Sequence, residues 1–225
     1  MRPECPVYRD DQRTRDDQYT QRVSEVQRVR LSPEERRAQL IAAGVNFLAD
    51  HSLDELSMDE LARQAGVSRP LLFHYFETRQ GMHLAVVTKA RDSLLVATAP
   101  RLELPPRERI HETLLRITHF VQQHRGTFYS LVRGIASGDP AVRTVVDESR
   151  ELNAERLLDA FIELGFEDTA MLRVALRAWV SYAEEALISL AIERDVDADA
   201  VVRFLEAGLR GMVGATRELQ APDYA

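Results

Sequence analysis

The stretch that most constrains the fold is residues 57–76, which read SMDELARQAGVSRPLLFHYF. Ser57 and Glu60 have the spacing of a capping box, which predicts the start of a short helix. Gly66 ends that helix, because only glycine takes a left-handed turn conformation without steric cost. Ser68 then caps a second short helix. The stretch therefore predicts a tight pair of helices with an aromatic cluster on the second one.

The rest of the chain repeats the helical pattern, with breaks at proline, glycine and acidic turns. Ser32 and Glu35 form another capping box and predict a helix that ends near Asp50. Further helices are expected at 78–98, 106–124, 127–137, 140–164, 168–193 and 197–219. Because no segment alternates apolar and polar residues as a strand does, we expect an all-α protein. We expect an N-terminal three-helix helix-turn-helix domain and a C-terminal helical domain.

Composition narrows the function classes. The net charge of −7 argues against general nucleic-acid affinity but leaves room for a small basic face. Cys5 is the single cysteine, so no disulfide forms within the chain and no thiol-based metal site is expected. No apolar run reaches the ~20 residues of a membrane-spanning helix, and the start lacks a signal-peptide core. We expect a cytoplasmic protein without a membrane partner.

The first 31 residues differ from the rest, with seven arginines against six acidic residues and few large apolar ones. They are interpreted as a flexible solvated tail, or else as an arm whose Arg28 and Arg30 reach a DNA groove. The predicted domains are therefore this tail (1–31), the helix-turn-helix domain (32–78) and the larger helical domain (79–220).

A helix-turn-helix requires a small residue within its first helix and a turn residue four positions later. Ala62 and Gly66 meet these two requirements, and Leu61 and Leu72 are apolar where the helices cross. The second helix then projects its N-terminal residues outward toward a DNA major groove. Those residues are Ser68, Arg69, Pro70, Leu71 and His74.

With the flanking segments, residues 33–89 resemble the DNA-binding domain of the tetracycline-repressor (TetR) family of bacterial transcription regulators. The matching motifs are FLADHS, the AGVS at 65–68, the LFHYF at 72–76 and the ETRQGM at 77–82. The resemblance implies a homodimer that binds double-stranded DNA and responds to a small ligand. The specific match covers about a quarter of the chain.

The resemblance also implies roles for single residues. Ser57 would donate to a phosphate, and Tyr75 would place its hydroxyl on another. Thr78 would cap the next helix, whose N-terminus faces the DNA backbone. Arg79 stands where the family usually has lysine, and a guanidinium also pairs well with phosphate. The chain departs from the family at Phe73, where tyrosine is common.

Two further departures are Ser52, in place of a usual glycine, and Pro70, which donates no hydrogen bond. Phe73 and Phe76 are expected in the core rather than on DNA. His74 is left open between a solvated surface residue and a DNA contact. Arg69 is expected to read a base or clamp a phosphate, since arginine to guanine is the commonest specific contact.

The helix expected at 168–193 carries apolar residues over a wide arc, so that it has two sides to bury. The last helix is expected at 197–219. Glycines at 208, 211 and 214 permit a close approach between helices. The resemblance implies that these two helices form the homodimer interface as a four-helix bundle. The alternative is that both are internal. A dimer is needed to place two recognition helices ~34–36 Å apart on a near-palindrome.

The resemblance further implies a cavity for a small apolar effector, whose binding tilts helix 78–98 and changes the spacing of the recognition helices. Ordinary helical core is the alternative for each lining residue. The expected lining is His119, Phe120, Phe128, Tyr129, Val132, Arg133, Phe161 and Trp179, with Glu184 as a further candidate polar partner.

The functional prediction is a ligand-responsive transcriptional regulator, a repressor released by its effector. The alternative is an all-helical interaction adaptor that does not bind DNA. An enzyme is not expected, because no Gly-rich phosphate loop, HExxH or Gly-x-Ser-x-Gly motif occurs. No cofactor is expected, and His111, His119 and His124 are spaced awkwardly for one metal-binding helical face.

Overall fold

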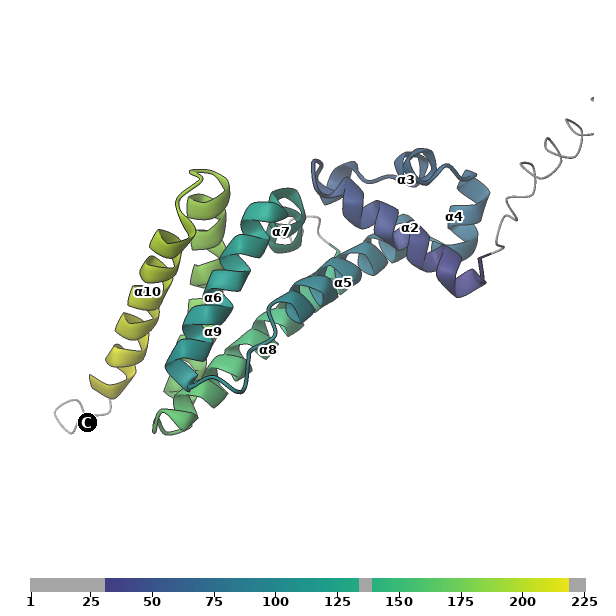
Figure 1. Ribbon diagram of the computed structural model, residues 1–225. Coiled ribbons are helices and arrows are strands. Elements are labelled where there is room, and N and C mark those ends of the chain that lie inside the picture. The colour runs from purple at the N-terminus through teal and green to yellow at the C-terminus, as the bar shows by residue number, and fades with distance from the viewer. Residues whose placement is uncertain (1–30, 134–138, 219–225) are drawn as a thin grey trace, which may run out of the picture. The chain divides into compact units, whose positions relative to one another are not determined.

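The computed structural model describes residues 31–133 and 139–218 (Figure 1). The chain falls into two compact units, Met1–Arg36 and Arg37–Ala225. In the first unit, Ser32 Oγ accepts from the Glu35 amide at 3.1 Å, and the Ser32 amide donates to Glu35 Oε2 at 2.7 Å. The predicted capping box is therefore formed. Except for Leu31, the predicted tail, with Arg28 and Arg30, lies outside the described residues.

All regular structure in the described ranges is helical, which confirms the predicted all-α class (Figure 1). The domain boundaries predicted at 31/32 and 78/79 stay predictions. The elements are α2 (Pro33–Phe47), the 3₁₀ turn η1 (Leu53–Glu55), α3 (Met58–Ala65), α4 (Arg69–Phe76), α5 (Arg79–Ala97), α6 (Pro106–Gln123), α7 (Arg125–Arg133), α8 (Pro140–Glu163), α9 (Ala170–Ala186), the π-helical segment η3 (Leu187–Ile192) and α10 (Ala198–Glu218).

Local signals position the helix-turn-helix. Ser57 Oγ accepts from the Glu60 amide at 3.0 Å, and Thr78 Oγ1 accepts from the Gly81 amide at 3.0 Å. Gly66 has φ 63°, the left-handed conformation that its position after α3 demands. Ser68 precedes α4 as predicted, but its side chain makes no capping hydrogen bond. The turn between α3 and α4 thus follows the sequence signals closely.

One hydrophobic core holds α2, α3 and α4 against the first half of α5. Leu40, Leu61, Leu72 and Val86 have no exposed surface in it. A Cβ added at Gly44 would lie 2.5 Å from Val86 Cγ2, so this glycine permits α2 and α5 to approach closely. Burial of four such side chains stabilises the fold by roughly 1.5–3 kcal/mol each.

A second core lies among α6, α8, α9 and α10. Leu176, Ile188 and Leu205 are fully buried there, and the Trp179 indole donates to the Leu205 carbonyl at 3.2 Å. A Cβ at Gly208 would lie 2.8 Å from the Tyr182 ring, so α9 and α10 approach closely at that point. The described helices include none long and apolar enough to span a bilayer.

Several element boundaries differ from the prediction by a few residues; for example, α2 ends at Phe47 rather than near Asp50. Helix α7 begins at Arg125 rather than 127, because the Phe128 amide already bonds the His124 carbonyl at 3.0 Å. Its predicted end at 137 lies outside the described residues. The helix predicted for 168–193 changes to π-helical turns at Leu187, where the wider hydrogen-bond pattern continues to Ile192.

Candidate functional site

The recognition helix α4 presents the predicted outward surface. Ser68, Arg69, Pro70 and His74 are exposed, and Leu71 is half-buried. Behind them Leu72 and Phe76, four residues apart, are buried on the opposite side of the helix. The first turn of α4, together with Ser68 and His74, is therefore accessible to a large partner.

The interpretation of Phe73 as a core residue is wrong, since 40% of its side chain is exposed. A helix turns by about 100° per residue, so Phe73 is rotated away from the inward line of Leu72 and Phe76. Its ring lies 5.5 Å from the guanidinium carbon of Arg69. Phe73 therefore supports Arg69 on the outer surface, while Phe76 is buried as predicted.

Arg69 also forms an exposed ion pair with Asp59 of α3, at 3.2 Å. Exposed pairs of this kind contribute about 0–1 kcal/mol, so the guanidinium can exchange this carboxylate for another anion at little cost. Asp59 therefore holds the Arg69 side chain near the recognition surface but leaves it able to bind another anion.

The residues assigned to phosphates lie at the edges of this surface. Ser57 and Thr78 use their oxygens as helix caps, and each hydroxyl keeps a proton to donate. Tyr75 is half-buried beside His74, with ring centroids 5.2 Å apart. Arg79 donates to the carbonyls of Asp54 and Leu56, the latter at 3.4 Å, which fixes it against the segment before α3.

Helix α5 links this surface to the second core. Near its start, His83 is buried and its Nε2 donates to the Leu56 carbonyl at 2.7 Å. Burial lowers the pKa of His83, so the neutral ring is favoured. Near its end, the same helix places Arg91 and Leu94 in the wall of a cavity. One rigid element therefore contacts both regions.

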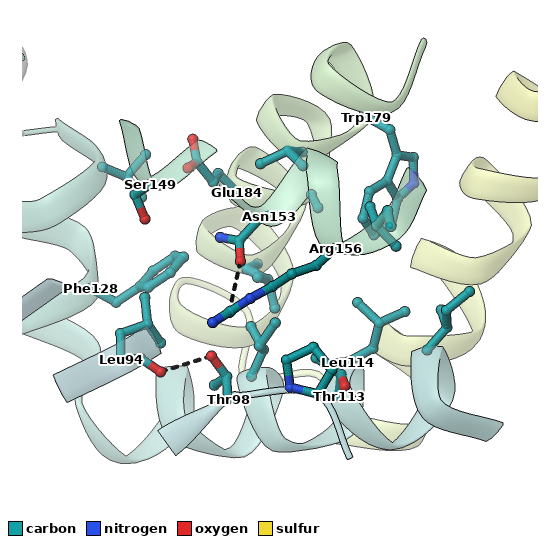
Figure 2. Close-up of a pocket in the computed structure, with 18 of the residues that line it drawn as sticks. Leu94, Thr98, Thr113, Leu114, Phe128, Ser149, Asn153, Arg156, Trp179 and Glu184 are labelled. Carbon is teal, nitrogen blue, oxygen red and sulfur yellow. Dashed lines mark hydrogen bonds between the residues drawn. The ribbon is translucent and has the colours of Figure 1, made fainter. Parts of the chain in front are cut away.

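The cavity has a volume of about 120 Å³ and lies among α5, α6, α7, α8 and α9. Most of its lining is aliphatic or aromatic, as in sites for small organic ligands. Figure 2 shows Phe128, Leu114 and Trp179 around it, with polar side chains from α8 between them.

The predicted ligand residues divide into two groups. Phe128, Val132, Trp179 and Glu184 line the cavity, whereas Phe161 lies beside a second hollow next to α10. The other predicted residues are absent from both linings. His119 and Tyr129 are exposed, Phe120 lies against the His124 ring at 4.5 Å, and Arg133 pairs with Glu185 at 2.9 Å on the surface.

Of the charged residues in the lining, sequence reasoning missed Arg109 and Arg156. Arg109 is buried and forms a two-pronged pair with Glu163, both bonds 2.7 Å long, which lowers the pKa of Glu163. Glu184 pairs with Arg150 at 2.8 Å, yet burial raises the pKa of Glu184. Arg156 of α8 is a further charged residue in the lining of the cavity. In residues 31–133 and 139–218, no cluster of three His, Cys, Asp or Glu is placed to bind a metal.

Two family models match the chain. Residues 40–86 match the bacterial regulatory proteins of the tetR family, and residues 106–209 match the tetracyclin repressor-like C-terminal domain. The chain belongs to the TetR family. Together the two matches cover the helix-turn-helix and most of the helices that surround the cavity.

Known TetR-family proteins agree with this assignment. The transcriptional activator FasR of Mycolicibacterium smegmatis is 26% identical over 176 residues, which are 77% of this chain and 80% of FasR. The regulator EthR of Mycobacterium tuberculosis is 30% identical over 76 residues, 34% of this chain and 35% of EthR. A TetR-family crystal structure from Streptomyces coelicolor superposes with a TM-score of 0.69 and 28% identity, covering 84% of this chain and 87% of that one.

As a TetR-family member, the protein is a DNA-binding transcription factor and not an enzyme. The family assignment also removes the alternative of a helical adaptor that never touches DNA.

Proposed function

We propose that the protein is a homodimeric repressor that binds a near-palindromic operator and is released by a small lipophilic effector. The observation that supports the proposal is that helix α5 contacts both the DNA-binding region and the cavity. Its first turns bond the segment before α3 through His83 and Arg79, and its last turns line the cavity through Arg91 and Leu94. A ligand that shifts α5 therefore changes the position of α4.

On the DNA side, the exposed first turn of α4 is the readout surface. Arg69 reads a base or clamps a phosphate, and Ser57, Tyr75, Thr78 and Arg79 contact the backbone. Ser68, Pro70, Leu71 and His74 complete the surface. Because Asp59 holds Arg69 through an exposed pair, a phosphate or guanine can replace that carboxylate at little cost.

The dimer would form through α9 and α10. Each helix buries one side in the second core and leaves an apolar stripe exposed on the other. On α9 the stripe contains Met171 and Val174, and on α10 it contains Phe204, Ala207 and Gly211. Large exposed apolar side chains at helical spacing favour a protein partner. A second copy of the same pair of helices would cover both stripes.

The effector would bind among the apolar walls of the cavity, with Phe128, Val132 and Trp179 in contact. His119, Phe120, Tyr129, Arg133 and Phe161 lie outside this lining, so we do not place them on the effector. The protein is released from DNA if the effector binds more tightly to a conformation in which α5 is shifted from its position in the DNA-bound dimer.

A gel-shift titration with the promoter region beside the protein's own gene tests the DNA contacts. Arg69→Ala should weaken binding by about 1–3 kcal/mol, and Tyr75→Phe by less, with the dimer intact. Arg143→Ala removes the same charge from an exposed position on α8 and is the matched control. Equal losses for Arg69→Ala and Arg143→Ala would remove the contact assignment.

Activation is a second candidate, because the relative FasR is named an activator. A reporter fused to the bound promoter separates the two in cells with and without the protein. If reporter output falls when the protein is deleted, the protein activates this promoter rather than repressing it. The DNA contacts and the dimer would be unaffected by that result.

A further inference from the structure

The cavity holds one cation without an opposite charge. Arg156 projects from α8 into the cavity, and Figure 2 shows its side chain extending between the walls. Its guanidinium donates a hydrogen bond of 3.4 Å from Nη1 to Asn153 Oδ1. Throughout the described ranges, no carboxylate forms an ion pair with it. Burial lowers the pKa of Arg156, but a guanidinium stays protonated in proteins.

The other charged groups in the lining are already neutralised. Arg109 binds Glu163 with two bonds of 2.7 Å, Glu184 binds Arg150 at 2.8 Å, and Arg91 binds Glu148 at 3.3 Å. Arg156 therefore differs from the other charged residues of the lining. Arg156 is half-buried, and a cation held partly out of water without an opposite charge makes no favourable contribution to folding that would explain its position.

Arg156 also belongs to a polar stripe. Ser149, Asn153 and Arg156 are four and three residues apart, the spacing that puts side chains on one face of a helix, and all three line the cavity. Together they make a hydrogen-bonding strip along one wall of an otherwise apolar space. The strip offers a positive fork at one end and neutral donors beside it.

We propose that Arg156 anchors the anionic head of an amphipathic effector whose apolar body fills the rest of the cavity. The head is an oxyanion, a carboxylate or a phosphate, because the guanidinium fork matches both with two parallel bonds. Asn153 supports the fork, and Phe128 and Trp179 contact the apolar body. This inference rests on the proposed effector site and names its ligand class.

The chain provides a direct probe, because Trp179 is its single tryptophan and lines the cavity. Fluorescence titration of the full chain would use decanoate, decyl phosphate and the neutral 1-decanol. We expect at least one anion to bind about tenfold or more tightly than 1-decanol. Whichever anion binds more tightly identifies the head group. Equal affinities for all three probes would overturn the proposal.

Two variants test the residue. Arg156→Gln should lose the preference for the anion by about 10- to 100-fold and leave 1-decanol binding nearly unchanged. Arg143→Gln removes the same charge from an exposed position on the same helix, outside the cavity lining, and should keep the preference. Loss of the preference in both variants, or in neither, would refute the anchor.

Melting curves guard against a folding defect. If Arg156 serves the ligand rather than the fold, unliganded Arg156→Gln should melt no lower than the wild type, and the preferred anion should raise the melting temperature of the wild type alone. A lower melting temperature without ligand would assign Arg156 to structure. Arg156→Lys, which keeps the charge without the fork, should retain part of the preference.

This titration contains no DNA, so its outcome is independent of the proposed release. Anion binding through Arg156 with an unchanged operator complex would leave the anchor standing and refute the release mechanism. Release of the operator by 1-decanol as readily as by the anion would support an effector cavity and refute the anionic head.

Discussion

His83 shows how one buried side chain ties stability to pH. Burial favours its neutral form, so its pKa in the folded chain lies below the ordinary value of about 6.5. Below that pH the unfolded chain binds more protons than the folded chain. The free energy of unfolding therefore falls as the pH drops through about 6.5 toward the folded pKa, and His83 adds no slope above that window.

Denaturant unfolding of the wild type and of His83→Gln between pH 7.5 and 5.5 measures this slope. The amide of glutamine can still donate to the Leu56 carbonyl but does not titrate, so the variant should lose stability less steeply on acidification. Nearby Arg79, Asp54 and Asp139 stay in both proteins. A slope for His83→Gln equal to that of the wild type would show that His83 does not set this pH dependence.

Single residues were predictable where the signal is local. Ser57, Gly66 and Thr78 act on their own helix ends, so their spacing alone indicated their roles. Phe73 and Arg156 were not, since their roles depend on which face of a helix another element covers. The strip at 149, 153 and 156 has a readable helical spacing, but polar residues on a helix usually face water.

Helix α7 illustrates a constraint between elements. A Cβ added at Gly126 would clash with the backbone carbonyl oxygens of Leu48 and Ala49, at the end of α2. Backbone cannot move aside as a flexible side chain can. Gly126 therefore lets α7, which carries Phe128 and Val132 of the cavity, lie directly against the helix-turn-helix region.

We predict that Gly126→Ala destabilises the protein by about 1–3 kcal/mol, the usual cost of overpacking. Gly214→Ala is the matched control, because a Cβ there meets nothing within 4 Å and alanine favours the helix. Chemical denaturation should separate the two changes in sign. A variant Gly126→Ala as stable as the wild type would show that α7 does not depend on this contact.

The order and number of the long helices followed from their breaks, because proline, glycine and capping residues interrupt the helical period. Two features did not follow from the breaks: the start of α7, where the Phe128 amide bonds the His124 carbonyl, and the π-helical turns of η3, whose Leu187 and Ile188 are buried in the second core. The cavity could not be predicted from the sequence either. It exists where five helices fail to fill the space between them, and no single helix encodes that.

The proposed assembly needs two copies, because few cations face DNA in one. Within Leu61–Arg79, three arginines stand against Glu77, and the whole chain carries −7. Few phosphate contacts per subunit give weak binding and a shallow salt dependence. When one recognition helix of a rigid dimer has bound DNA, the second is held close to its half-site. Its binding is then effectively intramolecular, so the affinity of the dimer for the operator rises steeply.

Phe204→Glu tests this dependence. Phe204 is 48% exposed on α10, in the stripe assigned to the dimer, and a carboxylate there would be buried against a second copy. We expect a monomer by sedimentation at micromolar concentration, an unchanged helical spectrum, and operator affinity reduced by about 100-fold or more. Leu102→Glu makes a similar change at a side chain 76% exposed between α5 and α6, and should stay dimeric. A Phe204→Glu protein that remains a dimer would place the interface elsewhere, and a monomer with full operator affinity would show that one subunit suffices.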